Sequence, residues 1–203
     1  MRVIIISGGD YSYSGKITDD DFVICADCGF DAALKNGIKV SLLMGDMDSV
    51  KADIGEEAKK LLFPSRKDFT DTELAVRHAV KMNPDEIVLL GCMGSRADHT
   101  LANIFILKYI NEQGIKACIA DKNNEIYYYK DFFEIKNSIG KTVSLIPITS
   151  EISGITTRGM DYPLSGEILY FGESRGVSNV VVSENAGYTS KSGEGFIIIT
   201  NGI

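Results

Sequence analysis

The 203-residue sequence lacks the features that define several large classes of protein. It contains no run of about 18 consecutive apolar residues, so we expect no transmembrane helix. The apolar run at the N-terminus, Val3 to Ile6, is too short for a signal peptide, and we expect a cytoplasmic protein with no membrane association. Basic residues are in deficit, since 21 Lys and Arg stand against 28 Asp and Glu. The resulting net charge of −7 argues against nonspecific binding to nucleic acid, which requires a basic surface.

The two commonest nucleotide-binding signatures are also missing. No G-x-G-x-x-G is present. The loop from Gly8 to Lys16 resembles a phosphate loop, but its glycine spacing is one residue too long and Ile17 follows the lysine. Two interpretations of this loop stay open. The backbone N–H groups of Gly8 and Gly9 could approach a phosphate, or the glycines could form a flexible turn.

Cysteine is scarce, with four residues in the chain. Cys25 and Cys28 have the C-x-x-C spacing, but a zinc site would need a second pair, and Cys92 and Cys118 are isolated. A redox motif would need its second cysteine to open a helix in a thioredoxin-like unit. Cys25 instead falls inside an apolar run, where burial is the usual fate of cysteine, so core packing is favoured over a zinc or redox role.

Up to Asp121 the sequence alternates between strand and helix patterns. This alternation predicts an α/β domain with a mostly parallel, doubly wound sheet and helices on its faces. Residues Glu56–Leu62 are expected to be helical, with Pro64 ending either this helix or a short strand. The other expected strands are Arg2–Ser7, Phe22–Ala26, Val40–Leu43, Glu86–Leu90 and Ile115–Ala120, and the other expected helices are Gly29–Asn36, Thr70–Lys81 and Asp98–Glu112.

After Asp121 the helical period disappears and short β-rich runs alternate with turns. This texture predicts a small all-β sandwich domain, so the chain divides into residues 1–121 and residues 122–203. The expected strands are Glu125–Lys130, Thr142–Ile146, Glu167–Phe171, Val177–Ser183 and Gly195–Thr200, with turns that include Ser192-Gly193.

Two aspartates, Asp46 and Asp48, follow a buried strand and the turn at Gly45. In an extended segment alternate side chains point the same way, so both carboxylates can face one point. Such a pair suits Mg²⁺, which takes one or two protein carboxylates together with phosphate oxygens. The alternative is a solvated Asp-rich turn, which is a common feature of protein surfaces.

Two further polar clusters follow later strands or begin helices. In the first, Thr70 or Asp71 can cap the next helix, but capping does not explain both Asp68 and Asp71. The second cluster combines glycines with Arg96, Asp98, His99 and, one turn along the helix, Asn103, and it suits an anion. Its alternative interpretation is Asp98 as a cap and Arg96 as a surface charge. Because ligands bind outside the carboxyl ends of parallel strands, the three clusters are expected to converge on one edge.

Four motifs spread over essentially the whole chain resemble the signature series of the thiamine pyrophosphokinase family. The family usually has Phe where Met47 stands and Gly where Cys28 and Ser95 stand, which are modest departures. The matching motifs are Gly45-Asp46-Met47-Asp48-Ser49, Lys67-Asp68-Phe69-Thr70-Asp71, Gly94-Ser95-Arg96-Ala97-Asp98-His99 with Asn103, and Gly176-Val177-Ser178-Asn179.

The resemblance implies transfer of the pyrophosphoryl group of ATP to the primary hydroxyl of thiamine, with thiamine pyrophosphate and AMP as products. ATP and the aspartates are all anionic, so Mg²⁺ is the implied cofactor. Asp46, Asp48 and Asp71 would bind Mg²⁺, and Asp98 would complete the catalytic set as a ligand or by orienting the attacking hydroxyl. The implied ATP-binding residues are Asp27, Lys67, Asp68, Arg96, His99 and Asn103.

The resemblance also implies a homodimer with active sites shared between subunits. Thiamine would be held by the C-terminal domain around Ser178 and Asn179 of the second subunit. Without the resemblance, these two residues have an equally good interpretation as polar residues at a strand edge. Two rival functions stay open: a Mg²⁺-dependent phosphohydrolase with water as the nucleophile, and a non-catalytic module that binds thiamine or nucleotides.

Overall fold

The computed structural model describes residues 1–46, 48, 50, 59–64 and 68–201. The chain divides into two compact units, Met1–Lys122 and Asn123–Ile203, and the predicted α/β protein of two domains is confirmed at this level. The division falls one residue beyond the predicted boundary. Within the described part of the chain, no helix is both long and apolar enough to cross a membrane.

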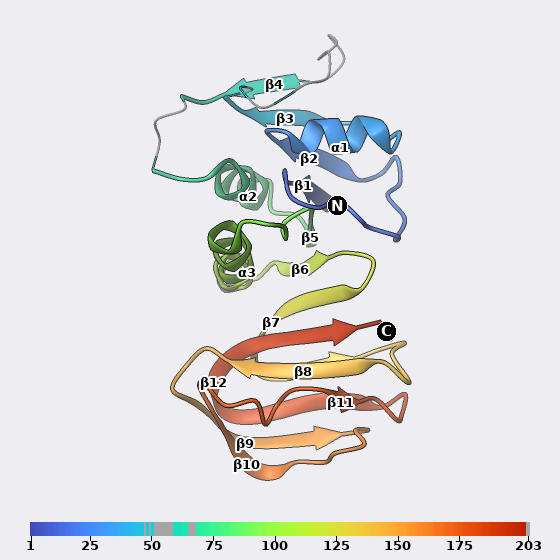
Figure 1. Cartoon of the computed structure of the whole chain (residues 1–203), viewed down its shortest axis with the longest axis vertical. Coiled ribbons are helices and arrows are strands. Elements are labelled where there is room, and N and C mark those ends of the chain that lie inside the picture. Colours follow the sequence, from blue (N-terminus) through green and yellow to red (C-terminus); the bar gives the residue numbers. More distant parts are fainter. Residues whose placement is uncertain (47, 49, 51–58, 65–67, 202–203) are drawn as a thin grey trace. The chain divides into compact units, whose positions relative to one another are not determined.

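The N-terminal unit is built on a parallel sheet in which β1 is central (Figure 1). Residues Val3 to Ile6 are wholly buried, as expected for an apolar strand covered on both faces. The strand order is β6-β5-β1-β2-β3-β4, and every pairing is parallel. The strands are β1 (Arg2–Ile6), β2 (Phe22–Ala26), β3 (Leu42–Gly45), β4 (Lys59–Leu62), β5 (Glu86–Leu90) and β6 (Lys116–Ala120).

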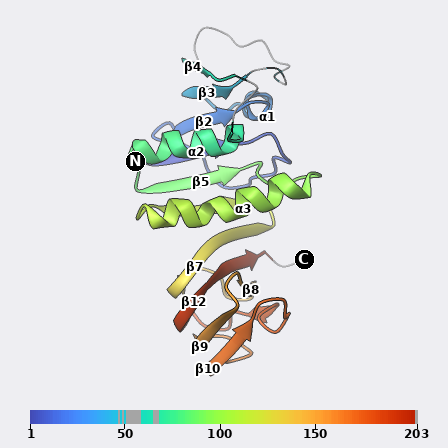
Figure 2. The ribbon, with the colours of Figure 1, turned by 90° about the vertical axis from the view of Figure 1, so that its left-hand side faces the viewer.

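Within the described part of this unit, three helices cover the sheet: α1 (Gly29–Lys35), α2 (Asp71–Lys81) and α3 (Ala97–Glu112). Figures 1 and 2 show α2 and α3 on one face of the sheet and α1 on the other. Right-handed crossovers require this, because the connection from β2 to β3 runs along the sheet in the opposite direction to those from β4 to β5 and from β5 to β6. Thr70 caps α2, because its hydroxyl accepts the Glu73 N–H at 3.1 Å. The alternative of Asp98 as a cap is wrong, since Arg96 is the N-cap residue of α3 and Asp98 lies in the first turn.

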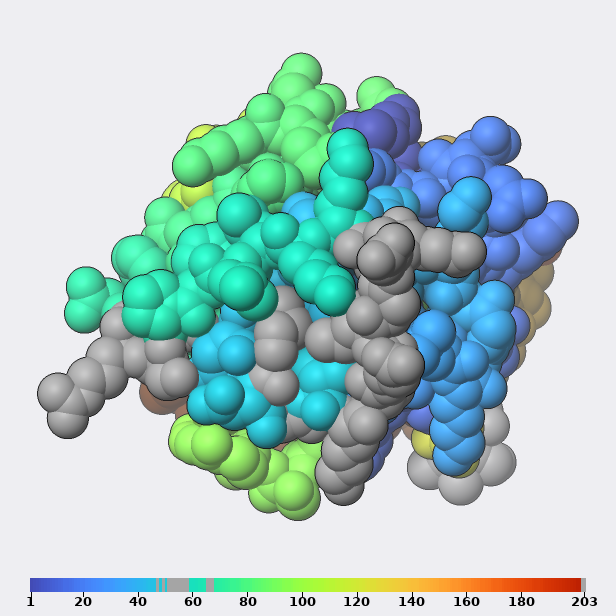
Figure 3. Space-filling view, turned by 90° about the horizontal axis from the view of Figure 1, so that it is seen from above, coloured from blue at the N-terminus to red at the C-terminus, as the bar shows by residue number. Residues whose placement is uncertain are grey.

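The helix predicted over Glu56–Leu62 is wrong where the structure can test it. Residues 59–62 form the strand β4, and residues 56–58 lie outside the described residues. All four side chains of β4 are exposed, so burial of an apolar face does not decide whether this segment is a helix or a strand. Figure 3 views the molecule from the end at which β4 lies. Pairing with the otherwise open edge of β3 satisfies its backbone groups and decides its conformation.

The C-terminal unit is an antiparallel sheet wrapped around one apolar core. The long strand β12 is its spine: it pairs along one side with β7 and along the other with β9 and then β8. Tyr129, Tyr188 and Ile197 are among the most deeply buried core residues. The strands are β7 (Asn124–Ile135), β8 (Thr142–Pro147), β9 (Glu151–Arg158), β10 (Ser165–Tyr170), β11 (Asn179–Val180) and β12 (Ala186–Thr200).

Three details of this unit differ from the sequence-based expectation. The strand β9 was not predicted, because Gly154 has a positive φ of 65° and breaks the alternation, so that the buried Ile152 and Ile155 are three residues apart. The predicted turn at Ser192-Gly193 is instead an irregularity within β12, where the register shifts between Thr189 and Glu194. The predicted strand Val177–Ser183 is reduced to the two residues of β11.

Candidate functional site

A cavity of about 560 Å³ lies at the carboxyl ends of the central strands of the N-terminal unit. Its walls come from the segments that follow β1, β2 and β5 and from the first turns of α2 and α3. The chain leaves β1 for β2 on one side, and β5 pairs with β1 on the other. The cavity therefore occupies the point at which the strand order reverses, where open α/β sheets bind their ligands.

Two glycine-containing loops abut at the floor of this cavity. The Gly9 N–H donates to the Gly91 carbonyl and the Asp10 N–H to the Met93 carbonyl, both at 2.8 Å. A Cβ atom on Gly9 would lie 2.4 Å from the Met93 oxygen, and Gly91 has a positive φ of 61°, so glycine is required at both positions. Backbone peptide groups consequently line the cavity. Gly8 and Gly9 both line the cavity, but the Gly9 N–H is already bonded to the Gly91 carbonyl, so that group does not serve the phosphate-loop interpretation. Lys16 lines a different hollow.

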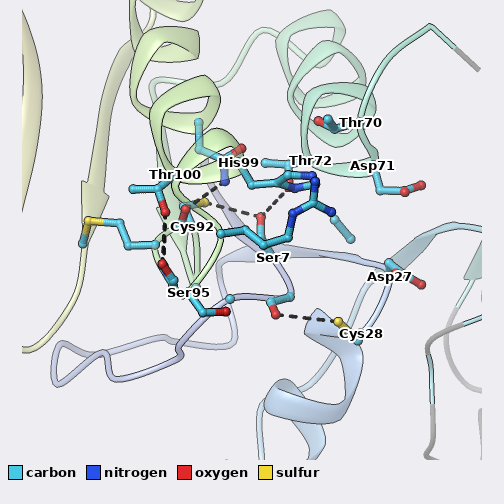
Figure 4. Close-up of a pocket in the computed structure, with 18 of the residues that line it drawn as sticks. Ser7, Asp27, Cys28, Thr70, Asp71, Thr72, Cys92, Ser95, His99 and Thr100 are labelled. Carbon is cyan, nitrogen blue, oxygen red and sulfur yellow. Dashed lines mark hydrogen bonds between the residues drawn. The ribbon is translucent and has the colours of Figure 1, made fainter.

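Carboxylates occupy one side of the cavity, where Figure 4 shows Asp27 and Asp71. Asp27 has a positive φ of 50°, and its N–H donates to the Met44 carbonyl at 2.8 Å. A Cβ atom built on Gly45 would lie 3.3 Å from both Asp71 Oδ1 and the Asp27 Cα atom. The end of β2, the end of β3 and the start of α2 thus meet at one place, and Asp68 also lines the cavity.

The pair Asp46 and Asp48 follows Gly45 directly but is not among the residues that line the cavity. The Asp48 N–H donates to Asp46 Oδ1 at 3.2 Å, which is the local bond of an Asx turn. Among the described residues, no group of three or more His, Cys, Asp or Glu side chains is arranged to hold a metal ion. Lys67 lies outside the described residues.

The opposite side of the cavity carries Arg96, His99 and Asn103. Arg96 forms a two-pronged ion pair with Asp98, with Nη2 to Oδ2 at 2.6 Å and Nε to Oδ1 at 3.2 Å. The guanidinium lowers the pKa of the Asp98 carboxyl to about 2, so this exposed side chain is ionised at neutral pH. Asp98 itself does not line the cavity, so it reaches the site through Arg96. The buried Asn103 amide donates to the Cys92 carbonyl at 2.8 Å and fixes the loop after β5.

A buried hydrogen-bonded network beneath the cavity was not predicted from the sequence. Ser7 Oγ accepts from the Thr72 hydroxyl at 2.9 Å and from the Cys92 thiol at 3.4 Å (Figure 4). Burial raises the pKa of the Cys92 thiol to about 12, so it stays protonated as a donor. The network joins the ends of β1 and β5 to the first turn of α2. One feature of the sequence could have indicated this network: Ser7 is a polar residue at the carboxyl end of an otherwise apolar strand.

The C-terminal unit has a cavity of its own, of about 510 Å³, which Ser178 and Asn179 help to line. The buried Asn179 side chain holds the Tyr162 segment at both ends: Oδ1 accepts the Tyr162 N–H at 3.0 Å and Nδ2 donates to its carbonyl at 2.7 Å. Ser178 has a positive φ of 64°. An ion pair between Arg175 and Glu167 forms another part of the wall. Asn179 therefore shapes this cavity, while Ser178 lies at its surface.

Comparisons with known proteins agree over nearly the whole chain. The family described as thiamin pyrophosphokinase, catalytic domain, matches residues 14–119, and the family described as thiamin pyrophosphokinase, vitamin B1 binding domain, matches residues 132–193. The thiamine pyrophosphokinase of Bacillus subtilis (strain 168) is 28% identical over 205 residues, which cover 95% of this chain and 96% of that protein.

Solved structures give the same answer for the fold. A crystal structure of thiamine pyrophosphokinase from Bacillus subtilis is similar with a TM-score of 0.88 at 27% identity, covering 100% of both chains. A thiamin pyrophosphokinase from Geobacillus thermodenitrificans has a TM-score of 0.89 at 23% identity, covering 100% of this chain and 98% of that one. At that identity the second likeness concerns the fold alone.

We expect Thr72→Val to lower the free energy of unfolding by about 1 kcal/mol, because it removes the donor to Ser7 while conserving volume. Urea titrations of Thr72→Val, Ser7→Ala and the double variant test this. If the bond is real, the double variant is less destabilised than the sum of the two single variants, by roughly 0.5 kcal/mol or more. Strict additivity would show that the two hydroxyls do not interact.

Proposed function

This chain belongs to the thiamine pyrophosphokinase family, and we propose that it transfers the pyrophosphoryl group of ATP to the hydroxyl of thiamine. The products are thiamine pyrophosphate and AMP. The observation that carries this proposal is the cavity at the strand-order reversal, where two glycine-containing loops, a guanidinium and carboxylates surround one space. A Mg²⁺-dependent phosphohydrolase and a non-catalytic binding module are the rival functions, and the products formed distinguish all three.

The triphosphate is proposed to lie against the glycine loops and the N-terminus of α3. Peptide N–H groups and the positive end of a helix both favour phosphate oxygens. Arg96 supplies a planar fork for two oxygens, and Asp98, ionised and paired with it, holds that fork in place. The other proposed ATP contacts are Asp27, Lys67, Asp68, His99 and Asn103, of which all but Lys67 are described and line the cavity.

Asp46, Asp48 and Asp71 are the proposed ligands of Mg²⁺. Carboxylate oxygens suit this hard cation, and the Asp71 carboxylate already lies beside Gly45, which directly precedes Asp46. Mg²⁺ commonly takes one or two protein carboxylates and completes its shell with water and phosphate oxygens, so a finished protein-only site is not needed. When bound, the ion neutralises phosphate charge beside the aspartates.

The two units are proposed to bind different ligands. The N-terminal unit, as a doubly wound domain, binds ATP and Mg²⁺, and the C-terminal unit, as a β-sandwich, binds thiamine and forms a homodimer with shared active sites. The C-terminal cavity suits a cationic aromatic ligand, because Tyr162 and Asp161 line it; Glu167, which also lines it, is already paired with Arg175. Ser178 would contact thiamine, and Asn179 would act by holding the Tyr162 segment.

The proposed chemistry is an in-line displacement at the β-phosphorus of ATP. A bond forms between the thiamine hydroxyl oxygen and the β-phosphorus while the bond from that phosphorus to the oxygen bridging the α-phosphate breaks. AMP leaves with the bridging oxygen, and the hydroxyl proton passes to solvent. Asp98 is proposed to influence the orientation of the hydroxyl through Arg96, because its own side chain does not line the cavity. Phosphoryl-group transfer depends mainly on positioning and charge stabilisation, which the rigid glycine loops and Arg96 are placed to supply.

Purified protein with thiamine, ATP and Mg²⁺ should form AMP and thiamine pyrophosphate in equal amounts, because one transfer yields one molecule of each. Chromatography of nucleotides and thiamine species measures both products, and a chelator in excess over Mg²⁺ should abolish them. Release of ADP or phosphate with no thiamine product would favour the hydrolase. Binding of thiamine or ATP with no product of any kind would favour the binding module.

Asp71→Asn should lower turnover by roughly a hundredfold or more while leaving the fold intact, because it removes a charge that offsets the metal and keeps the side-chain shape. Steady-state kinetics over a range of Mg²⁺ concentrations test this, with circular dichroism as the check on folding. Asp85→Asn is the matched control, since Asp85 is exposed and does not line the cavity. Wild-type turnover in Asp71→Asn would remove this residue from the metal site.

Ser178→Gly should raise the KM for thiamine by about three- to tenfold and leave the KM for ATP unchanged, as expected for the loss of one hydrogen bond. Glycine also removes the Cβ atom that is strained at the Ser178 φ of 64°, so Ser178→Ala, which keeps the Cβ and loses only the hydroxyl, is the companion variant and should give the same change in KM. Competitive binding measurements with each substrate separate the two effects. Equal weakening of thiamine and ATP would contradict the assignment of Ser178 to thiamine.

A further inference from the structure

One aromatic side chain in the N-terminal cavity has no role in the functions proposed so far. Phe69 directly precedes Thr70, the N-cap residue of α2. Its side chain lines the cavity and is 41% exposed. It is the one Phe, Tyr or Trp among the described residues that line this cavity. A large apolar ring left in contact with water at a polar site is unfavourable by itself, so a ligand that covers it would gain binding free energy.

A guanidinium holds the Phe69 ring in place. The Cζ atom of Arg77 lies 4.4 Å from the centroid of the Phe69 ring and 4.9 Å from that of Tyr109, in the range of cation–π contacts. Glu73 fixes this guanidinium, because its Oε1 accepts from Nε at 2.9 Å and from Nη2 at 2.8 Å. The ring is thus positioned by residues from both α2 and α3 before any ligand arrives.

The arrangement leaves the ring available to the cavity. One face of Phe69 lies under the guanidinium, and the side chain, which is partly exposed, is among those that line the cavity. A cation over one face draws electron density from the ring and favours stacking of an electron-rich purine against it. Because the contact with Arg77 already restricts the Phe69 side chain, stacking of a base on it would cost little further conformational entropy.

We propose that Phe69 is the stacking platform for the purine base of the nucleoside triphosphate, and that Arg77, held by Glu73, is the residue that positions it. The proposal rests on the proposed function only in taking the N-terminal cavity as the ATP site. Stacking recognises the flat face of a base and not its edge pattern, so Phe69 contributes affinity for ATP and for other purine triphosphates alike.

Calorimetric titration of the full chain tests the proposal with two probes, ATP and inorganic tripolyphosphate. Phe69→Leu should bind ATP roughly tenfold more weakly, while its affinity for tripolyphosphate, which has no base, stays unchanged. Phe69→Tyr should restore wild-type affinity for ATP, because it keeps the ring. Phe105→Leu is the matched control: Phe105 is 51% exposed on α3, outside the cavity, and its replacement should change neither affinity.

The positioning role of Arg77 is tested in the same way. Arg77→Met keeps much of the aliphatic stem but loses the charge, and it should weaken ATP binding by a smaller factor than Phe69→Leu. When Arg77→Met is combined with Phe69→Leu, it should have almost no further effect on ATP affinity, because the ring that Arg77 positions is absent. Full additivity of the two changes would overturn the positioning role.

A spectroscopic test is available because the chain contains no tryptophan. Phe69→Trp places a single indole at the proposed platform, and its fluorescence should change on addition of ATP but not of tripolyphosphate. A Phe105→Trp variant is the control and should respond to neither ligand.

Several outcomes would overturn the proposal. Wild-type affinity for ATP in Phe69→Leu would show that the ring does not contact the base. Equal weakening of ATP and tripolyphosphate would show damage to the phosphate-binding loops instead of lost stacking. A changed oligomeric state with unchanged ATP affinity would assign Phe69 to a protein contact. Each of these leaves the product assay of the wild-type protein unaffected, whereas failure of the wild-type protein to bind ATP would reject the proposed function itself.

Discussion

The contact on which the site depends is the direct approach of two backbone loops, those that follow β1 and β5. The two hydrogen bonds from Gly9 and Asp10 extend the pairing of these strands beyond the sheet. Only glycine allows the loops to come this close, as the 2.4 Å approach of a Cβ on Gly9 to the Met93 oxygen shows. The same approach brings Ser7 and Cys92 together, and the bond from Thr72 to Ser7 joins the first turn of α2 to them. A floor of peptide groups and a row of side chains are therefore positioned by one backbone constraint.

The charge pattern around this floor bears on the Mg²⁺ proposed for the site. The chain carries a net charge of −7, and carboxylates line one side of the cavity. On the other side Arg96 is already paired with Asp98, so it does not offset the remaining carboxylates. An incoming triphosphate would add several negative charges to this space. Divalent cations resolve that repulsion, and the same acidic surroundings favour a cationic second substrate.

The sequence predicted those parts of the fold that depend on local pattern. The buried run of β1 and the Thr70 cap of α2 follow from apolar content and hydroxyl chemistry, whereas Gly45, expected to form a turn, is the last residue of β3. Parts that depend on distant partners were not predictable. Strand β4 has no buried side chain and is defined by pairing with β3, and Gly154 interrupts the alternation of β9. The bond between Ser7 and Thr72 joins residues 65 positions apart, which no local pattern encodes.

The residues of a motif can also serve the site in different ways. Asn179 was expected to bind a ligand, but its amide oxygen and nitrogen both bond the Tyr162 backbone, so its place in the motif reflects the shape of the cavity. Asn103 is similar, because its amide bonds the Cys92 carbonyl. Phe69 is the opposite case: it lies between Asp68 and Asp71 in a motif whose expected roles fell on the aspartates, yet it lines the cavity and stacks against the Arg77 guanidinium. Position in a motif therefore indicates where a residue lies, whereas the partners of its side chain decide what it is able to contact.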